Sequence, residues 1–200
     1  MKRTFAEAMA HRRSYYSIGS DSPVLDEEVV HVIREAVKNV PSAFNSQSTR
    51  IVLLLSDEHK KLWSIVKETL KARISAEAFA KTEVKIDGCF AGGHGTVLYF
   101  EDTSVVKKLQ EAFPSYKDNF PTWSQHTSAM HQFAIWTMLE DMGLGASLQH
   151  YNPLIDDEVR RIWNLPGDWM LIAQMPFGTP IGEPEEKEFE DLSNRIKIFL

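Results

Sequence analysis

The fold is decided by the stretch from Ser124 to Pro153, which reads SQHTSAMHQFAIWTMLEDMGLGASLQHYNP. Between residues 129 and 139 only three side chains are polar: His131, Gln132 and Thr137. Apolar side chains therefore surround nearly the whole circumference, as they do in a helix that is buried on most sides. We expect a central helix here, with Ser124 as its N-cap.

Two glycines follow this helix. Gly143 is the expected left-handed stop, and Gly145 leads into a loop of short side chains in which backbone N–H groups can approach a ligand closely. The same residues would also suit a core helix with an ordinary glycine cap. A functional interpretation therefore depends on the other segments of the chain.

Hydrophobic periodicity places the remaining elements. It predicts helices over residues 5–13, 25–37, 56–73, 105–113 and 155–165, with residues 74–88 helical and then irregular. Apolar runs predict strands over residues 51–55, 96–100 and 169–175, the first of them buried on both faces, and the alternating end Arg195–Leu200 predicts a final strand. Residues 177–184 are rich in glycine and proline and are expected to be extended or looped. Because the strands are spread along the chain with helices between them, we expect an α+β fold in one domain, residues 1–200, with a small sheet covered by helices.

Composition narrows the class of protein. The chain has 200 residues, 43% of them hydrophobic and 25% charged, as in an ordinary globular protein, and no apolar run approaches the roughly 20 residues that span a bilayer. The N-terminus lacks the apolar core of a signal peptide, so we expect a cytoplasmic protein. Cys89 is the only cysteine, which excludes an intrachain disulfide, and a net charge of −6 argues against a nucleic-acid surface.

Several motifs are absent. The run Gly92-Gly93-His94-Gly95 lacks the spacing of a dinucleotide fingerprint and precedes a predicted strand instead of following one. The histidines do not fall in a metal-ligand pattern, so we predict no metal.

Three groups of residues have the chemistry that a flavin mononucleotide (FMN) requires. Arg12, Arg13 and Ser14 offer guanidinium and hydroxyl donors to a phosphate, and Arg195 and Lys197 project to the same side of the predicted final strand. Asn45 and Gln47 offer amides to the polar edge of the flavin ring. Each group also has a plain explanation, because arginines often end helices in solvent, and Asn and Gln often stabilise loops.

The order of these groups along the chain resembles that of the FMN-dependent nitroreductase family, and in particular its short fungal and bacterial branch. The resemblance rests on five motifs and two typical runs spread over the whole chain: Arg12-Arg13-Ser14, Pro41-Ser42-Ala43-Phe44-Asn45-Ser46-Gln47, Gly143-Leu144-Gly145-Ala146, Phe177-Gly178-Thr179-Pro180 and the Arg195-x-Lys197 ending, with Phe120-Pro121-Thr122-Trp123-Ser124 and Leu148-Gln149-His150-Tyr151-Asn152-Pro153. It implies a three-layer nitroreductase-like fold with a mainly antiparallel sheet. It also implies a homodimer that exchanges its C-terminal strands and holds two flavins at the interface.

The resemblance assigns roles residue by residue. It implies that Arg12, Arg13 and Ser14 hold the phosphate and ribityl end together with Arg195 and Lys197. It also implies that Ser42, Asn45 and Gln47 lie along the flavin, often from the partner subunit, and that the loop Leu148, Gln149 and His150 turns a backbone N–H toward flavin N5.

One position departs from the family pattern. Many relatives carry Lys or Arg near flavin N1 and O2, where negative charge develops on reduction, whereas this chain has Tyr16. A phenol is uncharged near pH 7 and stabilises that charge less. Lys81 or Lys85 is a possible replacement.

The resulting hypothesis is a ping-pong oxidoreductase that uses NADH or NADPH and passes hydride through flavin N5 to a nitroaromatic or quinone. Phe44, Phe120 and Trp123 are candidates for the apolar walls of the acceptor pocket. Two alternatives stay open: a flavin-binding regulatory or sequestering protein with little turnover, and a helical interaction protein without flavin.

Overall fold

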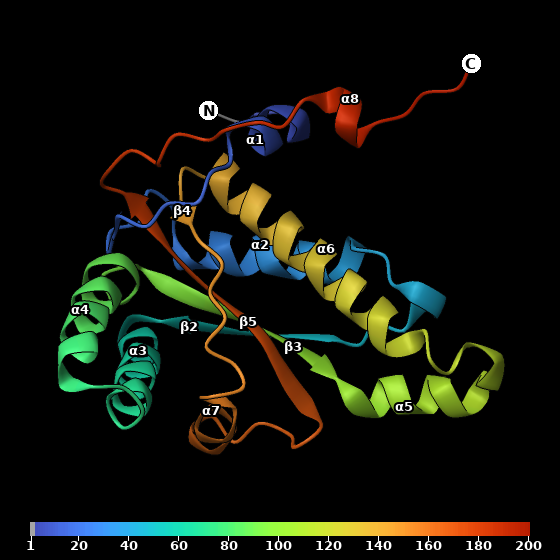
Figure 1. Ribbon diagram of the computed structural model, residues 1–200, viewed down its shortest axis with the longest axis horizontal. Coiled ribbons are helices and arrows are strands. Elements are labelled where there is room, and N and C mark those ends of the chain that lie inside the picture. Colours follow the sequence, from blue (N-terminus) through green and yellow to red (C-terminus); the bar gives the residue numbers. More distant parts are fainter. Residues whose placement is uncertain (1–2) are drawn as a thin grey trace.

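The computed structural model describes residues 3–200 and consists of one antiparallel sheet between two layers of helices (Figure 1). The strand order is β1-β5-β3-β2, and β4 pairs with β5. The strands are β1 (Ile18–Gly19), β2 (Thr49–Leu55), β3 (Gly95–Asp102), β4 (Gly145–Ala146) and β5 (Trp169–Pro180). The α+β fold with a small sheet is therefore confirmed, and its pairings are antiparallel throughout.

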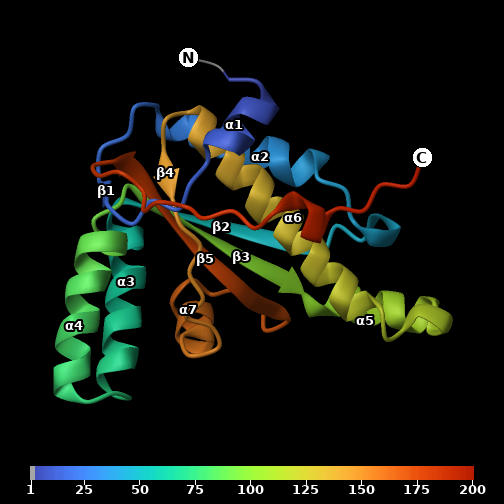
Figure 2. The ribbon, with the colours of Figure 1, turned by 45° about the horizontal axis from the view of Figure 1, so that its top comes forward.

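Eight α-helices lie within the described residues, at α1 (Phe5–His11), α2 (Asp26–Asn39), α3 (Ser56–Lys71), α4 (Ala76–Ile86), α5 (Thr103–Ala112), α6 (Phe120–Asp141), α7 (Asp156–Ile162) and α8 (Leu192–Arg195). Short turns of other helix types occur at Ala43–Asn45, Asp87–Ala91 and Pro114–Tyr116. Figures 1 and 2 show α1, α2 and α6 on one side of the sheet and α3, α4 and α7 on the other. None of the helices described between residues 3 and 200 is long and apolar enough to cross a bilayer.

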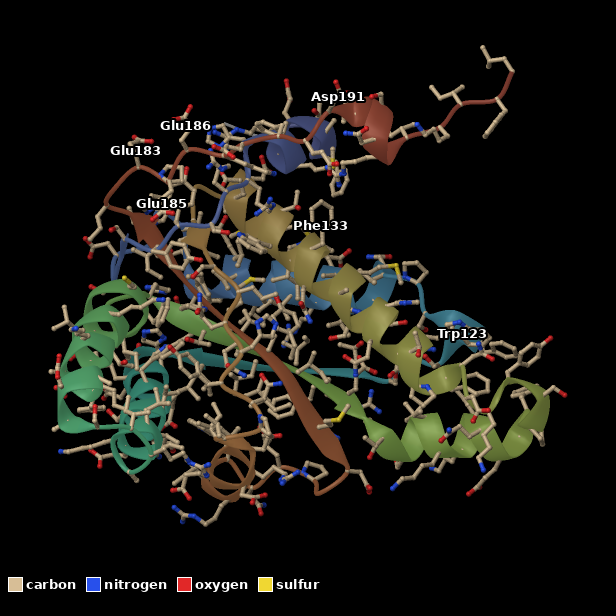
Figure 3. The ribbon with its side chains drawn as sticks, in the orientation of Figure 1. Trp123, Phe133, Glu183, Glu185, Glu186 and Asp191 are labelled. Atoms are coloured by element: carbon tan, nitrogen blue, oxygen red, sulfur yellow. The ribbon has the colours of Figure 1, made fainter. Side chains whose placement is uncertain are left out.

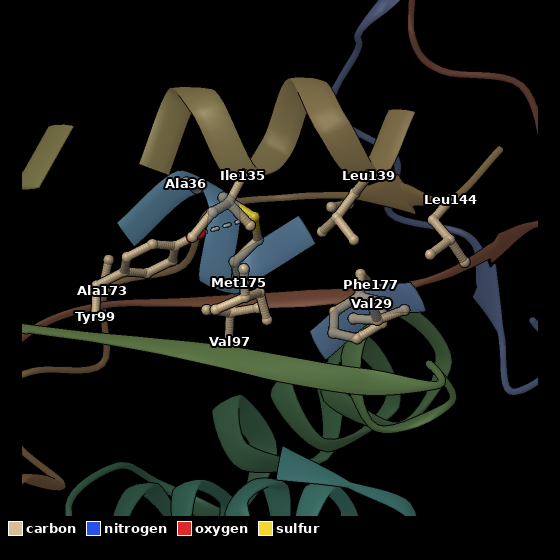
Figure 4. Packing of buried hydrophobic residues seen from close by; sticks show 12 residues of the cluster. Val29, Ala36, Val97, Tyr99, Ile135, Leu139, Leu144, Ala173, Met175 and Phe177 are labelled. Atoms are coloured by element: carbon tan, nitrogen blue, oxygen red, sulfur yellow. Dashed lines mark hydrogen bonds between the residues drawn. The ribbon is translucent and has the colours of Figure 1, made fainter. Parts of the chain in front are cut away.

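Strand β3 explains the two layers. All of its residues are buried, and successive side chains point to opposite faces of the sheet. Val97 and Tyr99 join the core beneath α2 and α6, which is drawn in Figure 4. Leu98 and Phe100 join the other core, against α3 and α7. Each large apolar side chain buried in this way contributes about 1.5–3 kcal/mol.

The central helix α6 begins earlier than the sequence predicts. It starts at Phe120, and Ser124 is not its N-cap; the Ser124 hydroxyl instead donates to the carbonyl oxygen of Pro121 at 2.9 Å. Proline is favoured in a first helical turn because its missing N–H would have no partner there, so Pro121 starts the helix. At the other end Gly143 has φ +83°, which confirms the predicted left-handed stop.

One face of α6 is exposed in the single chain. The prediction that this helix is buried on nearly all sides is therefore wrong for that face. Ala129, Met130 and Phe133 follow one another along this outward face, and Met130 and Phe133 are 40% and 39% exposed. The sequence pattern cannot distinguish burial within one chain from burial against another.

Both ends of the sheet also differ from prediction. Strand β2 is an edge strand whose central residues Ile51–Leu53 are only half-buried, because only β3 pairs with it. Strand β5 runs on to Pro180, and its Gly178 permits this: a Cβ there would lie 2.1 Å from the carbonyl oxygen of Gly19 in β1.

The predicted final strand is not present in this chain. Helix α8 ends at Arg195, and residues 196–200 form no strand and are exposed, because no strand edge of the same chain lies beside them. Figure 2 shows this end leading away from the body of the molecule.

Candidate functional site

The segment Arg12–Ser14 is fixed between α1 and β4. The N–H of Tyr15 donates to the carbonyl oxygen of Ala146 at 3.0 Å, and Ser14 forms a bridge with the same residue. The structure thus brings the arginine motif and the glycine loop after α6 together, although they are some 130 positions apart.

Arg12 is incompletely satisfied. Its guanidinium lies 4.4 Å from the centroid of the Trp136 ring, and its buried Nε has no hydrogen-bond partner among the described residues. Burial lowers the pKa of Arg12 from its ordinary value, while the carboxylate of Glu140 opposes this change. A guanidinium that is stacked, partly desolvated and short of an acceptor suits an anionic ligand.

A cavity of about 550 Å³ opens beside this motif. One wall consists of Arg12, Arg13, Ser14 and Tyr16, and the other is the acidic segment Glu185–Glu188. Arg13 donates a hydrogen bond to the backbone carbonyl of Glu185. Figure 3 shows Glu183, Glu185 and Glu186 gathered at this end of the molecule.

Arg195 and Lys197 do not line this cavity. Lys197 instead donates from Nζ to the carbonyl oxygen of Ser193, at 2.8 Å within its own tail. A single chain therefore does not assemble the complete set of phosphate ligands that the sequence suggests.

The loop after β4 is pinned to strand β5. Gln149 and Gln174 exchange backbone hydrogen bonds of 2.7 and 2.9 Å, and the N–H of Tyr151 donates to the side chain of Gln174 at 2.7 Å. The N–H of Gln149 is thus engaged. Among the described backbone bonds none uses the N–H of Leu148 or His150, so these two are the groups of the predicted loop that can serve a ligand.

The structure separates the two lysine candidates. Lys85 lies beside Tyr16, with its Nζ 6.0 Å from the centroid of the phenol ring. Lys81 forms an ion pair with Glu77 at 3.7 Å, and both side chains are more than four-fifths exposed. Of the two lysines, Lys85 is therefore the one that lies next to Tyr16.

The loop of residues 42–47 is held in an unusual conformation. Phe44, Asn45 and Gln47 have φ values of 56°, 51° and 48°, a region that a bulky side chain such as Phe seldom adopts. Ser42 stabilises the loop by accepting the N–H of Gln47 at 3.0 Å. Strained backbone of this kind is commonly found at ligand sites.

The three aromatic residues proposed from the sequence form one cluster. Phe44 stacks on Trp123 with centroids 5.9 Å apart, and Phe120 lies 5.2 Å from Phe44 and 5.3 Å from Trp123. An open cavity of about 450 Å³ adjoins the cluster, lined by Phe44 and Trp123 with Ala43, His126, Thr127 and Met130. Phe113 and Tyr116 complete the cluster and were not predicted, because a short helix end and a loop carry no sign of packing against residue 44.

The aromatic cluster and the arginine motif lie at opposite ends of α6. Trp123 is in the first turn of the helix, whereas Trp136, under Arg12, is thirteen residues further on, or roughly 20 Å along the axis at 1.5 Å per residue. Figure 3 shows Trp123 at one end, Phe133 between and the glutamates of the acidic segment at the other. Another residue missed from the sequence, Trp136, looked like an ordinary core residue of an apolar helix.

Together, the antiparallel sheet between helical layers, the partly buried guanidinium of Arg12 and the open aromatic pocket define an α+β domain with a site suited to an anionic, aromatic ligand. The chain belongs to the nitroreductase family, which it matches over residues 9–179. Nitroreductases are flavin-dependent.

Two relatives that are more than 30% identical support the family assignment, and a more distant structure shares the fold. The nitroreductase FRM2 of Saccharomyces cerevisiae is 36% identical over 98% of this chain and 96% of its own. The nitroreductase CinD of Lactococcus lactis, solved with nicotinic acid, is 43% identical and superimposes with a TM-score of 0.91 over 98% of this chain and 100% of that chain. A protein of the same fold from Desulfovibrio desulfuricans, solved in complex with FMN, is 16% identical with a TM-score of 0.67, over 100% of this chain and 99% of that chain.

Proposed function

We propose that the protein is an FMN-dependent oxidoreductase that works as a homodimer and reduces small nitroaromatic or quinone acceptors at the expense of NADH or NADPH. The observation that carries the proposal is the partly buried Arg12 guanidinium, whose Nε has no protein partner in the described residues and which lies beside Ser14 and the β4 loop. FMN, when bound, supplies hydride transfer in a ping-pong reaction.

The phosphate of FMN fits the cavity beside Arg12. Arg12 and Arg13 donate guanidinium N–H groups to it and Ser14 adds its hydroxyl, since Arg binds phosphate through paired donors. Arg195 and Lys197 complete the grip from the C-terminal segment of a second copy. The acidic segment Glu185–Glu188 forms the opposite wall and must keep its carboxylates clear of the phosphate.

Two features of this chain act on the flavin ring. The N–H of Leu148 or His150 can donate to N5, because neither takes part in the backbone bonds that join alternate residues of this loop to β5. Lys85 beside Tyr16 replaces the cation that many relatives carry nearer the N-terminus, and it stabilises negative charge at N1 and O2.

The case for a homodimer rests on the two exposed apolar surfaces of the chain. One is the face of α6 that includes Met130 and Phe133; the other is the C-terminal segment, where Phe199 is 93% exposed. Apolar surfaces of this kind mark interfaces. In a two-fold dimer the same face of both subunits meets, so two α6 helices that pack in antiparallel orientation bring the Trp123 end of one beside the Arg12 end of the other. The acceptor then binds between a flavin of one subunit and the aromatic cluster of its partner.

The proposal is tested by the visible spectrum and by anaerobic stopped-flow of the purified protein. We expect a yellow protein whose flavin is bleached by NADH or NADPH and reoxidised by menadione or a nitrofuran. A flavin that stays oxidised would favour the second candidate, a flavin-binding protein with little turnover, which is supported by the uncharged Tyr16 at the position where many relatives carry Lys or Arg. A colourless protein that cannot be reconstituted with FMN would refute both.

The phosphate site has its own test. Arg12→Ala combined with Lys197→Ala should lose most bound FMN while the circular dichroism spectrum stays unchanged. Arg34→Ala, an exposed arginine on α2, is the matched control and should retain flavin. Full occupancy in the double variant would contradict the assignment.

A further inference from the structure

The side chain of Arg12 is held in place without a hydrogen bond. Within residues 3–200 its guanidinium makes no hydrogen bond and no ion pair, and its Nε is buried without a partner. Its contact is with the indole ring of Trp136 on α6, whose centroid lies 4.4 Å from the guanidinium carbon. A guanidinium over the face of a tryptophan at this distance is attracted to the ring. The ring therefore orients Arg12 and leaves its hydrogen-bond donors unused.

The carboxylate that acts on Arg12 is engaged with other residues. Glu140 lies one turn after Trp136 on α6, and one of its oxygens is 2.6 Å from Nδ1 of His11 and 3.9 Å from the guanidinium of Arg3. A direct ion pair with Glu140 would use the donors of Arg12 and cancel its charge. Because Arg12 is stacked instead of paired, it keeps both for an anion.

Trp136 contributes its ring face and not its N–H. The indole Nε1 is buried and has no hydrogen-bond partner in the part of the chain that the structure describes. A buried donor without a partner is unfavourable, and phenylalanine would present a ring without this cost. Tryptophan is, however, the best aromatic partner for a cation, so the contact with Arg12 accounts for its presence at this position.

A second stacked arginine in the chain has a different environment. Arg50 lies over the Trp169 ring at 6.0 Å, but it also forms an ion pair of 2.9 Å with Asp102. The donors of Arg50 thus serve the protein itself. Arg12 differs because its donors are unused and because it lines the cavity of about 550 Å³ at the arginine motif.

We propose that Trp136 is a positioning residue for the cofactor: its ring holds the Arg12 guanidinium toward the cavity, and this contact makes the protein select FMN, which has a phosphate, over riboflavin, which has none. This inference rests on the proposed function, because FMN is taken as the ligand of the cavity. Trp136 is not among the residues that line the cavity, so it acts through Arg12.

The test compares the dissociation constants of FMN and riboflavin, measured by quenching of flavin fluorescence with the full-length protein after its flavin has been removed. Riboflavin reports on the contacts of the ring and ribityl chain alone. Trp136→Leu should weaken FMN binding about fivefold to tenfold and change riboflavin binding by less than about twofold. Trp136→Phe keeps an aromatic face and should retain most of the preference for FMN.

Two controls separate this role from a general effect on the fold. Trp169→Leu removes the half-buried tryptophan from the other stacked arginine and should leave the ratio of the two dissociation constants unchanged. A double-mutant cycle tests whether Trp136 acts through Arg12: in an Arg12→Ala background, Trp136→Leu should weaken FMN binding no further.

Three results would overturn the inference: an unchanged preference for FMN in Trp136→Leu, equal weakening of FMN and riboflavin, or a full additional loss in the Arg12→Ala background. Each of these leaves the proposed function intact if the wild type binds FMN more tightly than riboflavin. A wild type that binds the two flavins equally, or binds neither, would instead refute the phosphate site of the proposed function and this inference with it.

Discussion

Acid should destabilise the protein through one buried histidine, His59 on α3. This side chain is 1% exposed and lies between Thr96, whose hydroxyl is 2.8 Å from Nδ1, and the carbonyl oxygen of Ala91, 3.2 Å from Nε2. Trp63 donates its indole N–H to the same Thr96 hydroxyl at 3.0 Å. One tautomer satisfies every group: Nε2–H donates to Ala91, and the Thr96 hydroxyl donates to Nδ1.

Protonation would break this arrangement, because Nδ1 would then become a donor facing a hydroxyl whose proton points at it. Burial, the largest cause, lowers the pKa of His59 from 6.5 to about 4. The unfolded chain therefore takes up a proton near pH 6.5 that the folded chain refuses until about pH 4. Stability from this group is complete above pH 6.5 and is lost as pH falls toward 4, by about 2 kcal/mol at pH 5 and about 3 kcal/mol at pH 4.

The measurement is urea unfolding at pH 7.5 and pH 5, at fixed protein and FMN concentrations because ligand and subunit binding both affect stability. His59→Gln, which places a neutral hydrogen-bonding amide at this position and cannot titrate, is compared with the wild type. We expect the wild type to lose about 2 kcal/mol more than the variant between the two pH values. His131, whose pKa burial also lowers, and Glu101, whose pKa burial raises, contribute to both proteins alike. An equal loss in the two proteins would refute the reasoning about His59.

Three further predictions concern the sheet, the dimer and the flavin. Gly178→Ala should destabilise the fold by about 3 kcal/mol or more, since its Cβ would meet a β1 carbonyl at 2.1 Å, whereas Gly167→Ala, with nothing within 4 Å, should be neutral in the same urea titration. Phe133→Lys on the exposed face of α6 should yield a monomer in analytical ultracentrifugation and lower FMN retention, and a dimer that persists would count against this interface. Lys85→Met should lower the midpoint potential of the bound flavin by about 20–30 mV, measured by dye-linked reduction, while Lys81→Met leaves it unchanged. The reverse result would show that Lys81, and not Lys85, supplies the positive charge near the flavin.

The sequence predicts the elements that depend on neighbouring residues better than the contacts between residues far apart in the chain. Helix α2 is confirmed because its periodic apolar residues determine which face is buried. Strand β3 is confirmed because its continuous apolar run suits burial on both faces of the sheet. The predicted start of α6 is wrong because a serine at residue 124 and a proline at residue 121 are both good helix-start signals. In the structure the proline lies in the first turn of the helix, and the serine lies inside the helix.

Long-range pairing was less predictable. Apolar and polar residues alternate at Arg195–Leu200 as in a strand, but this segment pairs with no strand of the same chain. Periodicity alone does not show which strand such a segment would pair with. The extension of β5 past Phe177 depends on a glycine that lets β1 approach, a contact between residues far apart in sequence.

The candidate site shows the same limit. The sequence analysis proposes Phe44, Phe120 and Trp123 as the walls of an acceptor pocket, and the structure brings the three rings together. Only Phe44 and Trp123 line the open cavity, because Phe120 is buried beneath them. The contact between Trp136 and the Arg12 guanidinium could not be predicted from the sequence, because only the fold brings these two distant residues together.

The most direct test of a site shared between two copies is complementation in a mixed dimer. One partner carries Arg12→Ala with Arg13→Ala, and the other carries Phe44→Ala with Trp123→Ala; the two are coexpressed with different affinity tags and purified through both. Each parent alone should be nearly inactive toward a nitrofuran. If one subunit supplies the phosphate ligands and its partner the aromatic cluster, the mixed dimer has one fully native site and should regain about half of the wild-type activity. Activity no higher than that of either parent would contradict the shared site.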